Sequence, residues 1–475
     1  MTYDTIIKGA TVVTAADTTR CDIGIRDGRI AVLAETLSAS EAADCIDAGG
    51  LLALPGGVDA HVHLAEDGYG GLKMADGFAS GSVSAACGGT TTMLPFVTQR
   101  PGKTLREAVR AYHEKAEGQS VIDYGFHLII TDPNDQVLGQ DLPALLEDGY
   151  TSFKVYMTYE GYKVDDGQML SILSAARRAG GFVMVHAEND HCIQWLTAEL
   201  ERAGETHPSA FTKAHGPVVE REATHRAISL AEIVETPVYI VHVSAAGAME
   251  QIAWAQGKGL PVHAETCPQY LFLSHEDFEK AGWDATKCLC SPPPRETGNA
   301  DELWRGIANG TFQVVSSDHC PYRIEGQGGV KDASGGELHF DKVNPGVPGI
   351  ETRLPLLFSE GVGKGRIDLN RFVAVTATNP AKLFGLYPRK GTIAVGSDAD
   401  IALWDPEKTV TITNDRLHSG ADYTPYEGRT VKGYPIRTMV RGVTVAQDGE
   451  PTGRTGGGAF LKRGKSEAVV PPRTS

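Results

Sequence analysis

Short apolar, β-branched runs alternate with longer helix-patterned segments from about residue 54 to about residue 385 of the 475-residue chain. The intervening stretches Gly167–Ala179 and Val219–Val234 carry apolar residues at the three-to-four spacing of an amphipathic helix. Alternation of this kind is typical of a parallel sheet, and eight runs predict a closed (β/α)₈ barrel. The eight runs are Leu54–His63, Thr90–Phe96, Val121–Thr131, Ser152–Tyr159, Phe182–Asn189, Pro237–Ser244, Pro261–Cys267 and Phe312–Cys320.

The segments that flank this block have a different texture. Residues 1–53 and 386–450 read as short strands joined by turns, as in CDIGIRDGRIAVLA and TMVRGVTVAQDGE. We expect them to form one small β-sandwich domain from both ends of the chain, beside a barrel at 54–385. Residues 451–475 are rich in Gly, Lys, Arg and Pro and lack periodicity. They predict either a disordered tail or an arm that docks on a neighbouring subunit.

Composition limits the class of partner. The formal charge is −16, from 44 basic and 60 acidic residues, whereas a nucleic acid or an anionic membrane would require a basic surface. The first residues lack the basic and apolar regions of a signal peptide, and no run of about 18 apolar residues occurs. We therefore expect a soluble, cytoplasmic protein. The scattered cysteines disfavour a disulfide framework, and Cys288 and Cys290 are interpreted as core residues rather than metal ligands.

Histidines and a carboxylate stand at the ends of several predicted strands. His61 and His63 lie two residues apart on the first barrel strand, so both imidazoles point to the same side. His186, His242 and Asp318 end the fifth, sixth and eighth runs. Active sites of barrels lie at the carboxyl ends of the strands, where a buried polar group is costly unless it is paired or ligating. The pattern therefore predicts a metal site at this end of the barrel.

Lys154 lies on the fourth predicted strand, and its side chain should point inward because Phe153 and Val155 face the helices. A buried ammonium beside metal cations is strongly disfavoured. Carboxylation of the amine by CO₂ would turn it into an anion with two oxygens, able to bridge two divalent ions. The alternative is a lysine with a buried stem and a head that reaches solvent or a carboxylate. The neighbouring histidines and Asp318 favour carboxylation.

The order HxH, Lys, His, His and Asp on strands one, four, five, six and eight resembles the binuclear amidohydrolase superfamily. The segments SFKVYMTY, VMVHAEN, YIVHVS, AETCPQYL, SSDHC and DYTPYEG are similar to the dihydropyrimidinase and D-hydantoinase family along nearly the whole chain. The resemblance implies a hydrolase that opens dihydropyrimidine or 5-substituted hydantoin rings to N-carbamoyl amino acids. It also implies homo-oligomers, commonly tetramers, with a homodimer as the alternative.

The resemblance further implies a role for each residue of the metal site. Zinc is favoured by the ligand types, and manganese or cobalt also suits a mixed nitrogen and oxygen site. A hydroxide that bridges the two ions would attack the ring carbonyl, and Asp318 would carry its proton to the departing nitrogen. The two divalent ions would be held by His61, His63 and Asp318 on one side, by His186 and His242 on the other, and by N6-carboxylated Lys154 between them.

Two further residues match family positions that bind the substrate, and a third departs from the family pattern. Tyr159 matches a tyrosine that donates a hydrogen bond to the oxyanion, and Ser291 matches a residue whose backbone holds the ureide ring. Asn344 departs from the pattern, because the chain reads NPGVPG where hydantoinases read PNGGPG. Because the asparagine is displaced, the backbone contact usually made there and the identity of the ring that the site accepts both stay open.

The loop Ala65–Asp76 and the segment Tyr159–Asp166 are expected to form the wall against the substituent of the ring. Leu72, Met74 and Tyr69 in the first of these suggest an apolar or aromatic substituent.

Other activities fit the sequence less well. Allantoinase or another cyclic imide hydrolase is the nearest alternative, because Glu66 and the segment GVPGIET are close to its patterns. Dihydroorotase is disfavoured, since Ala65 stands where an arginine would bind its acidic substrate, and a mononuclear deaminase would not need Lys154. Relatives that act as scaffolds have lost ligands, whereas every ligand position is filled here.

Overall fold

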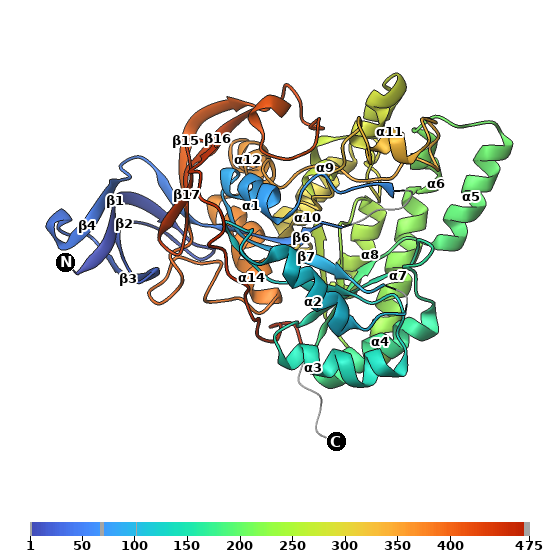
Figure 1. Cartoon of the computed structure of the whole chain (residues 1–475), viewed down its shortest axis with the longest axis horizontal. Helices are drawn as coiled ribbons and strands as arrows, with labels where there is room; N and C mark the ends of the chain where they lie inside the picture. Colours follow the sequence, from blue (N-terminus) through green and yellow to red (C-terminus); the bar gives the residue numbers. More distant parts are fainter. Residues whose placement is uncertain (1, 67–70, 101, 470–475) are drawn as a thin grey trace.

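The computed structural model describes residues 2–66, 71–100 and 102–469. A strand-rich lobe built from both ends of the chain lies beside a larger lobe of strands and helices (Figure 1). Among the described residues, no helix is long and apolar enough to cross a membrane.

The larger lobe contains a parallel sheet whose strands pair in the order of the sequence. A bridge between Val62 and His319 joins the end of the last strand to the first and closes the barrel. The predicted (β/α)₈ class is therefore confirmed. The strands of the sheet are β6 (Gly57–Val62), β7 (Thr90–Thr98), β9 (His127–Ile129), β10 (Ser152–Tyr156), β11 (Phe182–His186), β12 (Val238–Ile240), β13 (Val262–Thr266) and β14 (Val314–Val315), with the short β8 (Asp123–Tyr124) paired to β7.

Each of the eight predicted runs overlaps this sheet, and Val121–Thr131 holds both β8 and β9, but the first boundary was wrong. Leu54 lies in β5 (Leu52–Pro55), which pairs with the sheet of the other lobe. The barrel strand begins at Gly57, and Gly56 marks the crossing between the two sheets. A Cβ at Gly56 would lie 2.2 Å from the side chain of Thr91. The chain therefore changes sheets where only a glycine fits.

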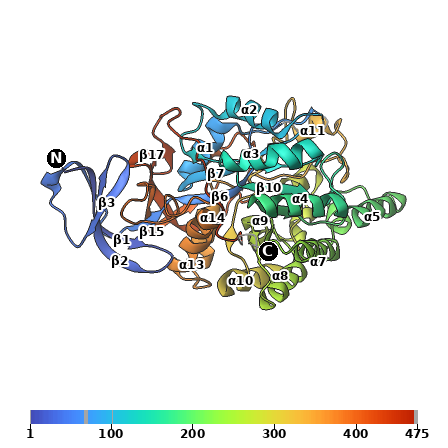
Figure 2. The ribbon, with the colours of Figure 1, turned by 90° about the horizontal axis from the view of Figure 1, so that it is seen from below.

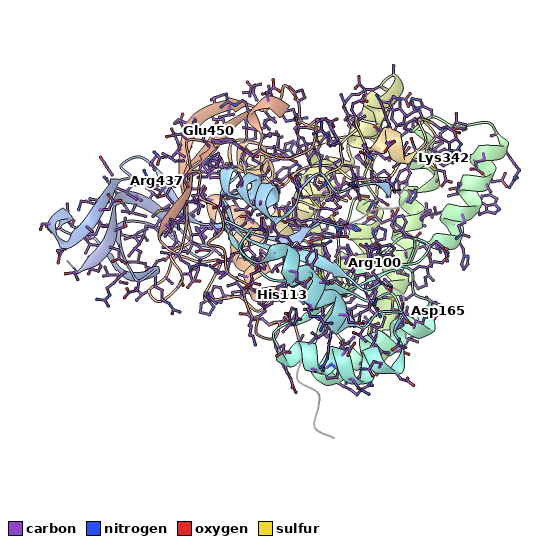
Figure 3. All side chains as sticks on the ribbon, in the orientation of Figure 1. Arg100, His113, Asp165, Lys342, Arg437 and Glu450 are labelled. Carbon is purple, nitrogen blue, oxygen red and sulfur yellow. The ribbon has the colours of Figure 1, made fainter. Side chains whose placement is uncertain are left out.

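Helices cover the outside of the barrel, and Figure 2 shows α3, α4, α7, α8 and α10 arranged around the strands. The two predicted helical stretches lie in α4 and α7. Helix α4 starts after Asp165, whose side chain accepts a hydrogen bond from the Gln168 N–H at 2.8 Å, and it ends at Gly180 with φ 84° (Figure 3). The helices are α1 (Phe78–Cys87), α2 (Leu105–Ala116), α3 (Leu142–Glu147), α4 (Asp166–Ala179), α5 (Asp190–Arg202), α6 (Ala210–Ala214), α7 (Pro217–Val234), α8 (Ala246–Gly257), α9 (Pro268–Phe272), α10 (Asn299–Asn309), α11 (Val330–Ala333), α12 (Arg353–Leu357), α13 (Leu369–Val373) and α14 (Asn379–Leu383).

The strand-rich lobe is one mostly antiparallel sheet. Its order is β18-β17-β16-β15-β5-β1-β2-β3, with β4 paired to β1. The pairing of β5 with β15 joins the two ends of the chain, and Ile7, Ile23, Ile401 and Met439 pack in its core. The remaining strands are β1 (Tyr3–Val13), β2 (Thr18–Arg26), β3 (Arg29–Ala34), β4 (Ala42–Asp47), β15 (Ile401–Thr411), β16 (Thr430–Val440), β17 (Val443–Gln447) and β18 (Glu450–Pro451).

Residues 452–469 pack against the base of their own barrel, which is the end where the strands begin. The Tyr124 N–H donates to the Ala459 carbonyl at 3.0 Å, and the Leu461 N–H donates back to the Tyr124 carbonyl at 2.7 Å. Leu461 is fully buried, and so is the guanidinium of Arg463. Residues 452–469 are thus ordered on their own barrel, and a contact with a neighbouring subunit stays a prediction.

Candidate metal centre and active site

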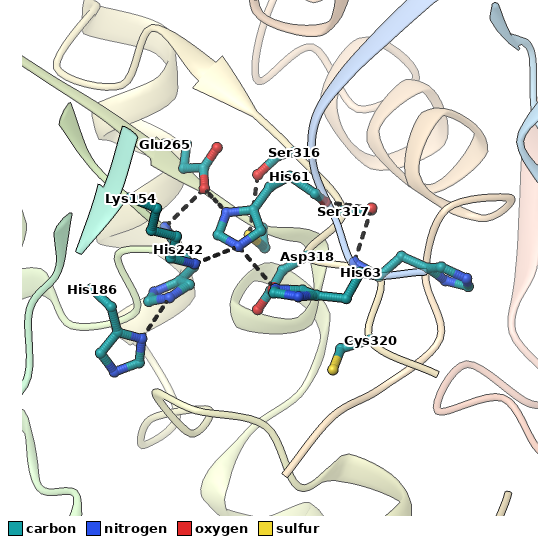
Figure 4. Close-up of polar contacts among 12 residues, drawn as sticks. His61, His63, Lys154, His186, His242, Glu265, Ser316, Ser317, Asp318 and Cys320 are labelled. Atoms are coloured by element: carbon teal, nitrogen blue, oxygen red, sulfur yellow. Dashed lines mark hydrogen bonds and ion pairs between the residues drawn. The ribbon is translucent and has the colours of Figure 1, made fainter. Parts of the chain in front are cut away.

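The carboxyl ends of the barrel strands, here called the mouth, bring the six predicted ligand residues into one cluster (Figure 4). The ligand atoms of His61, His242 and Asp318 all lie within 4.8 Å of one another. The six residues are His61 on β6, Lys154 on β10, His186 at the end of β11, and His63, His242 and Asp318 in the loops just after β6, β12 and β14.

The contacts inside the cluster are close. Lys154 Nζ lies 3.0 Å from His61 Nε2, which lies 3.2 Å from Asp318 Oδ1. His63 Nε2 approaches the same carboxylate oxygen at 3.6 Å. On the other side, His186 Nδ1 and His242 Nε2 face each other at 2.9 Å. Nitrogen and oxygen donors from five strand ends therefore converge on one small volume.

Three of the histidines have their outer ring nitrogen on a glutamate. His61 Nδ1 pairs with Glu265, His63 Nδ1 lies 3.0 Å from Glu66 Oε1, and His186 Nε2 lies 2.8 Å from Glu188 Oε2. Such a carboxylate takes the N–H of the imidazole, so the other nitrogen keeps a lone pair for a metal ion. The donor set, neutral imidazoles plus one aspartate, suits zinc, manganese or cobalt. The residues present therefore fit a metal centre.

Burial sets the charge of these groups. Burial lowers the pKa of His61, His186 and His242, which keeps the imidazoles in the neutral form that ligates metals. Burial also lowers the pKa of Lys154 to about 8, although Asp318 acts in the opposite direction. A lower pKa increases the fraction of neutral amine, and the neutral amine is the form that reacts with CO₂.

The backbone at the mouth is strained. Tyr159, His242 and Asp318 have φ angles of 76°, 36° and 47°, in the left-handed region that residues with a Cβ rarely adopt. Each such conformation costs about 1–3 kcal/mol and persists only where its surroundings enforce it. The strain falls on residues singled out by the sequence, and it aims their side chains into the cluster rather than along the strand.

A cavity of about 160 Å³ lies beside the cluster. The three predicted substrate-binding residues, Tyr159, Ser291 and Asn344, all contribute to its wall. The Tyr159 hydroxyl donates a hydrogen bond to Ser291 Oγ, which donates to Glu188 Oε2 at 2.8 Å. A fully buried glutamate thus connects His186, a candidate metal ligand, to the residues that would hold the substrate.

The expected wall against the ring substituent is only partly present. Met74 lines the cavity, together with Tyr156, Tyr162 and Tyr322. Leu72 is wrong as a wall residue, because it is 1% exposed and packs in a neighbouring hydrophobic cluster. Tyr69 lies outside the described residues.

Sequence reasoning missed the three glutamates as partners of the ligands. Glu265 lies on β13, in the run VHAETC, and its carboxylate is fully buried. Glu188 follows the candidate ligand His186 by two residues, and Glu66 follows His63 by three. A charged residue inside a predicted buried strand was the available signal for Glu265.

Comparison with known proteins identifies the family. The model of the amidohydrolase family matches residues 52–445. The chain belongs to the amidohydrolase family. Among curated amidohydrolases it is similar to the D-hydantoinase of Geobacillus stearothermophilus, with 44% identity over 467 residues, covering 98% of each chain. It is also similar to the D-phenylhydantoinase of Escherichia coli O1:K1, with 39% identity over 469 residues, covering 98% of this chain and 99% of the relative.

Comparison with solved structures of amidohydrolases supports the same family assignment. The dihydropyrimidinase from Brevibacillus agri NCHU1002 superimposes with a TM-score of 0.94 at 42% identity, covering 97% of this chain and 99% of that one. The resemblance found in the motifs is confirmed in both sequence and fold.

Proposed function

We propose that this amidohydrolase opens the ring of a dihydropyrimidine or a 5-substituted hydantoin by hydrolysis to the N-carbamoyl amino acid. The observation that carries the proposal is the convergence of carboxylate-held histidines, Lys154 and Asp318 beside a cavity at the barrel mouth. Similarity to D-hydantoinases and to a dihydropyrimidinase over nearly the full chain supports this ring class. Allantoinase activity is not favoured by these relatives.

The proposed centre contains two divalent ions, with zinc favoured by the ligand types. His61, His63 and Asp318 would hold one ion, and His186 and His242 the other. Lys154, carboxylated at Nζ, would bridge them as an anion, since its free ammonium would repel both. When bound, the ions would supply a nucleophilic water at neutral pH and polarise the carbonyl of the substrate.

The remaining steps belong to side chains of this chain. A new C–O bond forms at the ring carbonyl while its C–N bond breaks. Asp318 accepts a proton from the attacking water and delivers it to the departing ring nitrogen, which would otherwise leave as a poor anion. The Tyr159 hydroxyl exchanges its bond to Ser291 for one to the oxyanion. The Ser291 backbone holds the ureide, and Asn344, which also lines the cavity, would be a further contact.

We also propose a cytoplasmic homotetramer, with a homodimer as the alternative assembly. Light scattering coupled to size-exclusion chromatography of the metal-loaded protein would distinguish these masses from that of a monomer.

The test of the proposed function is ring opening of dihydrouracil, 5-substituted hydantoins, allantoin and phthalimide by zinc-, manganese- and cobalt-loaded protein. Asp318→Asn and Lys154→Ala serve as controls. We expect turnover of a hydantoin or dihydrouracil that both substitutions abolish. Activity on allantoin alone would transfer the assignment to allantoinase. No turnover of any ring by fully metallated protein would overturn the hydrolase assignment in favour of a binding or scaffold role.

A further inference from the structure

His319 follows Asp318 directly and is fully buried, with a partner on each side of its ring. Its Nδ1 accepts a hydrogen bond from the Gly349 N–H at 3.0 Å, and its Nε2 lies 3.1 Å from Asp76 Oδ2. A backbone N–H can only donate, so Nδ1 must be the acceptor and Nε2 must donate to Asp76. The two partners therefore fix a single tautomer and orientation of the ring.

Asp76 connects this histidine to the strand-rich lobe. Its side chain is fully buried and accepts hydrogen bonds from Ser419 Oγ at 2.6 Å and from the Gly420 N–H at 2.8 Å. Ser419 and Gly420 lie in the connection between β15 and β16. A Cβ at Gly420 would lie 2.3 Å from the Ala75 carbonyl oxygen. The backbones at Gly420 and Ala75 are therefore so close that only a glycine fits at position 420.

The backbone of His319 in turn is hydrogen-bonded to His63 and, through Ser317, to His61. Its carbonyl accepts from the His63 N–H at 2.7 Å, and its N–H donates to Ser317 Oγ at 3.0 Å. Ser317 Oγ also donates to the His61 carbonyl at 3.2 Å. Asp318, with φ 47°, is thus enclosed between two residues that are bonded to the first barrel strand.

We propose that the Asp76–His319 pair, anchored by Ser419 and Gly420, is a positioning device for Asp318. It holds the strained backbone of Asp318 so that the carboxylate faces His61 and His63, and through it the strand-rich lobe acts on the proton-transfer step. His319 and Asp76 are positioning residues, since neither reaches the reacting atoms. The proposal rests on the proposed function, because Asp318 is given its role there.

The test is Asp76→Asn in the metal-loaded full-length protein. The Gly420 N–H can only donate, so the asparagine oxygen must face it and the amide NH₂ group then faces His319 Nε2. The ring of His319 therefore loses its acceptor or must change tautomer against the Gly349 N–H. We expect kcat to fall on the order of 10- to 100-fold, as for other residues that orient ligands. KM should change less than about threefold, and metal content should stay at the wild-type value. The visible absorption spectrum of the cobalt-loaded protein should shift, because it reports the geometry around Asp318.

His418→Asn is the matched control. His418 precedes Ser419 in the same loop and pairs with the buried Glu351 at 3.0 Å, so it anchors the loop to the barrel without touching Asp76 or His319. We expect it to lower thermal stability while leaving kcat and the cobalt spectrum unchanged. If Asp76→Asn does not fold, Ser419→Ala removes one hydrogen bond to the same carboxylate, and a smaller fall in kcat at unchanged KM is expected.

An unchanged kcat and cobalt spectrum in the Asp76→Asn protein would overturn the positioning role, as would equal losses of kcat in the His418→Asn protein. Failure of the proposed function looks different, because the wild-type protein would then open no ring. The cobalt spectra of the wild type and the two variants would still show whether Asp76 controls the geometry at Asp318.

Discussion

The two ends of the barrel both bury a cation, and they treat it in opposite ways. At the base, the Arg463 guanidinium donates to Ser152 Oγ at 2.9 Å and to the Phe126 carbonyl, which are neutral oxygen acceptors. At the mouth, two residues further along the same strand, Lys154 Nζ has the imidazole of His61 at 3.0 Å. A buried cation that donates to oxygen acceptors can keep its charge, whereas a cation among the imidazoles of a candidate metal site must change its charge to be tolerated beside metal ions.

The backbone shows the same contrast. The turns that lead into β10 and β11 at the base reach positive φ at Gly149 and Gly180, where no Cβ is strained. At the mouth, His242 and Asp318 adopt positive φ with full side chains. Glu235, before β12 at the base, also has positive φ (54°), but it is the exposed C-cap of α7, whereas His242 and Asp318 at the mouth are buried.

The largest expected effect is that of Lys154→Ala at the mouth. Loss of the proposed bridging carbamate should remove at least one ion per chain and lower kcat/KM on the order of 10³-fold or more, since a bound ion supplies several kcal/mol. Mass spectrometry measures the metal content per chain, and ring-opening kinetics measure kcat/KM. Full metal content and activity in this variant would contradict the bridging role.

Tyr159→Phe should have the next largest effect. Removal of the hydroxyl leaves the aromatic ring in the cavity wall but deletes the proposed oxyanion donor, so kcat should fall about 10²-fold. Metal content and the midpoint of thermal unfolding should stay close to those of the wild type. A rise in KM with kcat unchanged would instead assign Tyr159 to substrate binding alone.

Leu461→Ala tests the base. Leu461 is fully buried in a hydrophobic cluster with Phe182, Met184 and Phe384, so truncation should cost about 2–3 kcal/mol of stability. Because Leu461 is not one of the residues that line the cavity, kcat should be unchanged at temperatures where the protein is folded. Lys462→Ala, at the exposed neighbouring position, should leave the unfolding midpoint unaltered. A large loss of kcat in the Leu461 variant would break the division between the two ends.

The smallest expected effect concerns His263 on β13, a histidine near the base. Burial lowers its pKa from the ordinary 6.5 to about 4. The unfolded chain therefore takes up a proton between these values while the folded chain does not, and stability falls as the pH drops below about 6.5. We expect a loss of about 1 kcal/mol between pH 7 and pH 5 in urea unfolding, since the side chain is only partly shielded. His263→Gln should reduce this dependence, whereas substitution of the exposed His191 should not.

Features that repeat along the chain could be predicted from the sequence, whereas contacts that occur only once could not. Eight apolar runs and the polar residues that end them follow from strand periodicity, and this was enough to locate His61, Lys154 and Asp318. The tail had no such signal, because it docks through backbone hydrogen bonds and single buried side chains such as Leu461. The link from Ser419 to Asp76 joins segments 343 residues apart through one hydrogen bond, which no local pattern reveals.

The bridge that closes the barrel also has a consequence for the order of folding. The Ser317 hydroxyl and the His61 carbonyl that it contacts are separated by 256 residues of chain. Contacts between residues so far apart in the sequence form late in folding. The conformational entropy of the long intervening loop must be lost before these contacts can stabilise the fold. Two of the proposed ligands of the first ion, His61 and His63, come from β6 and the loop directly after it, whereas Asp318 arrives only with the last strand. A chain stalled before closure therefore has an incomplete site, so metal uptake would report the completion of folding.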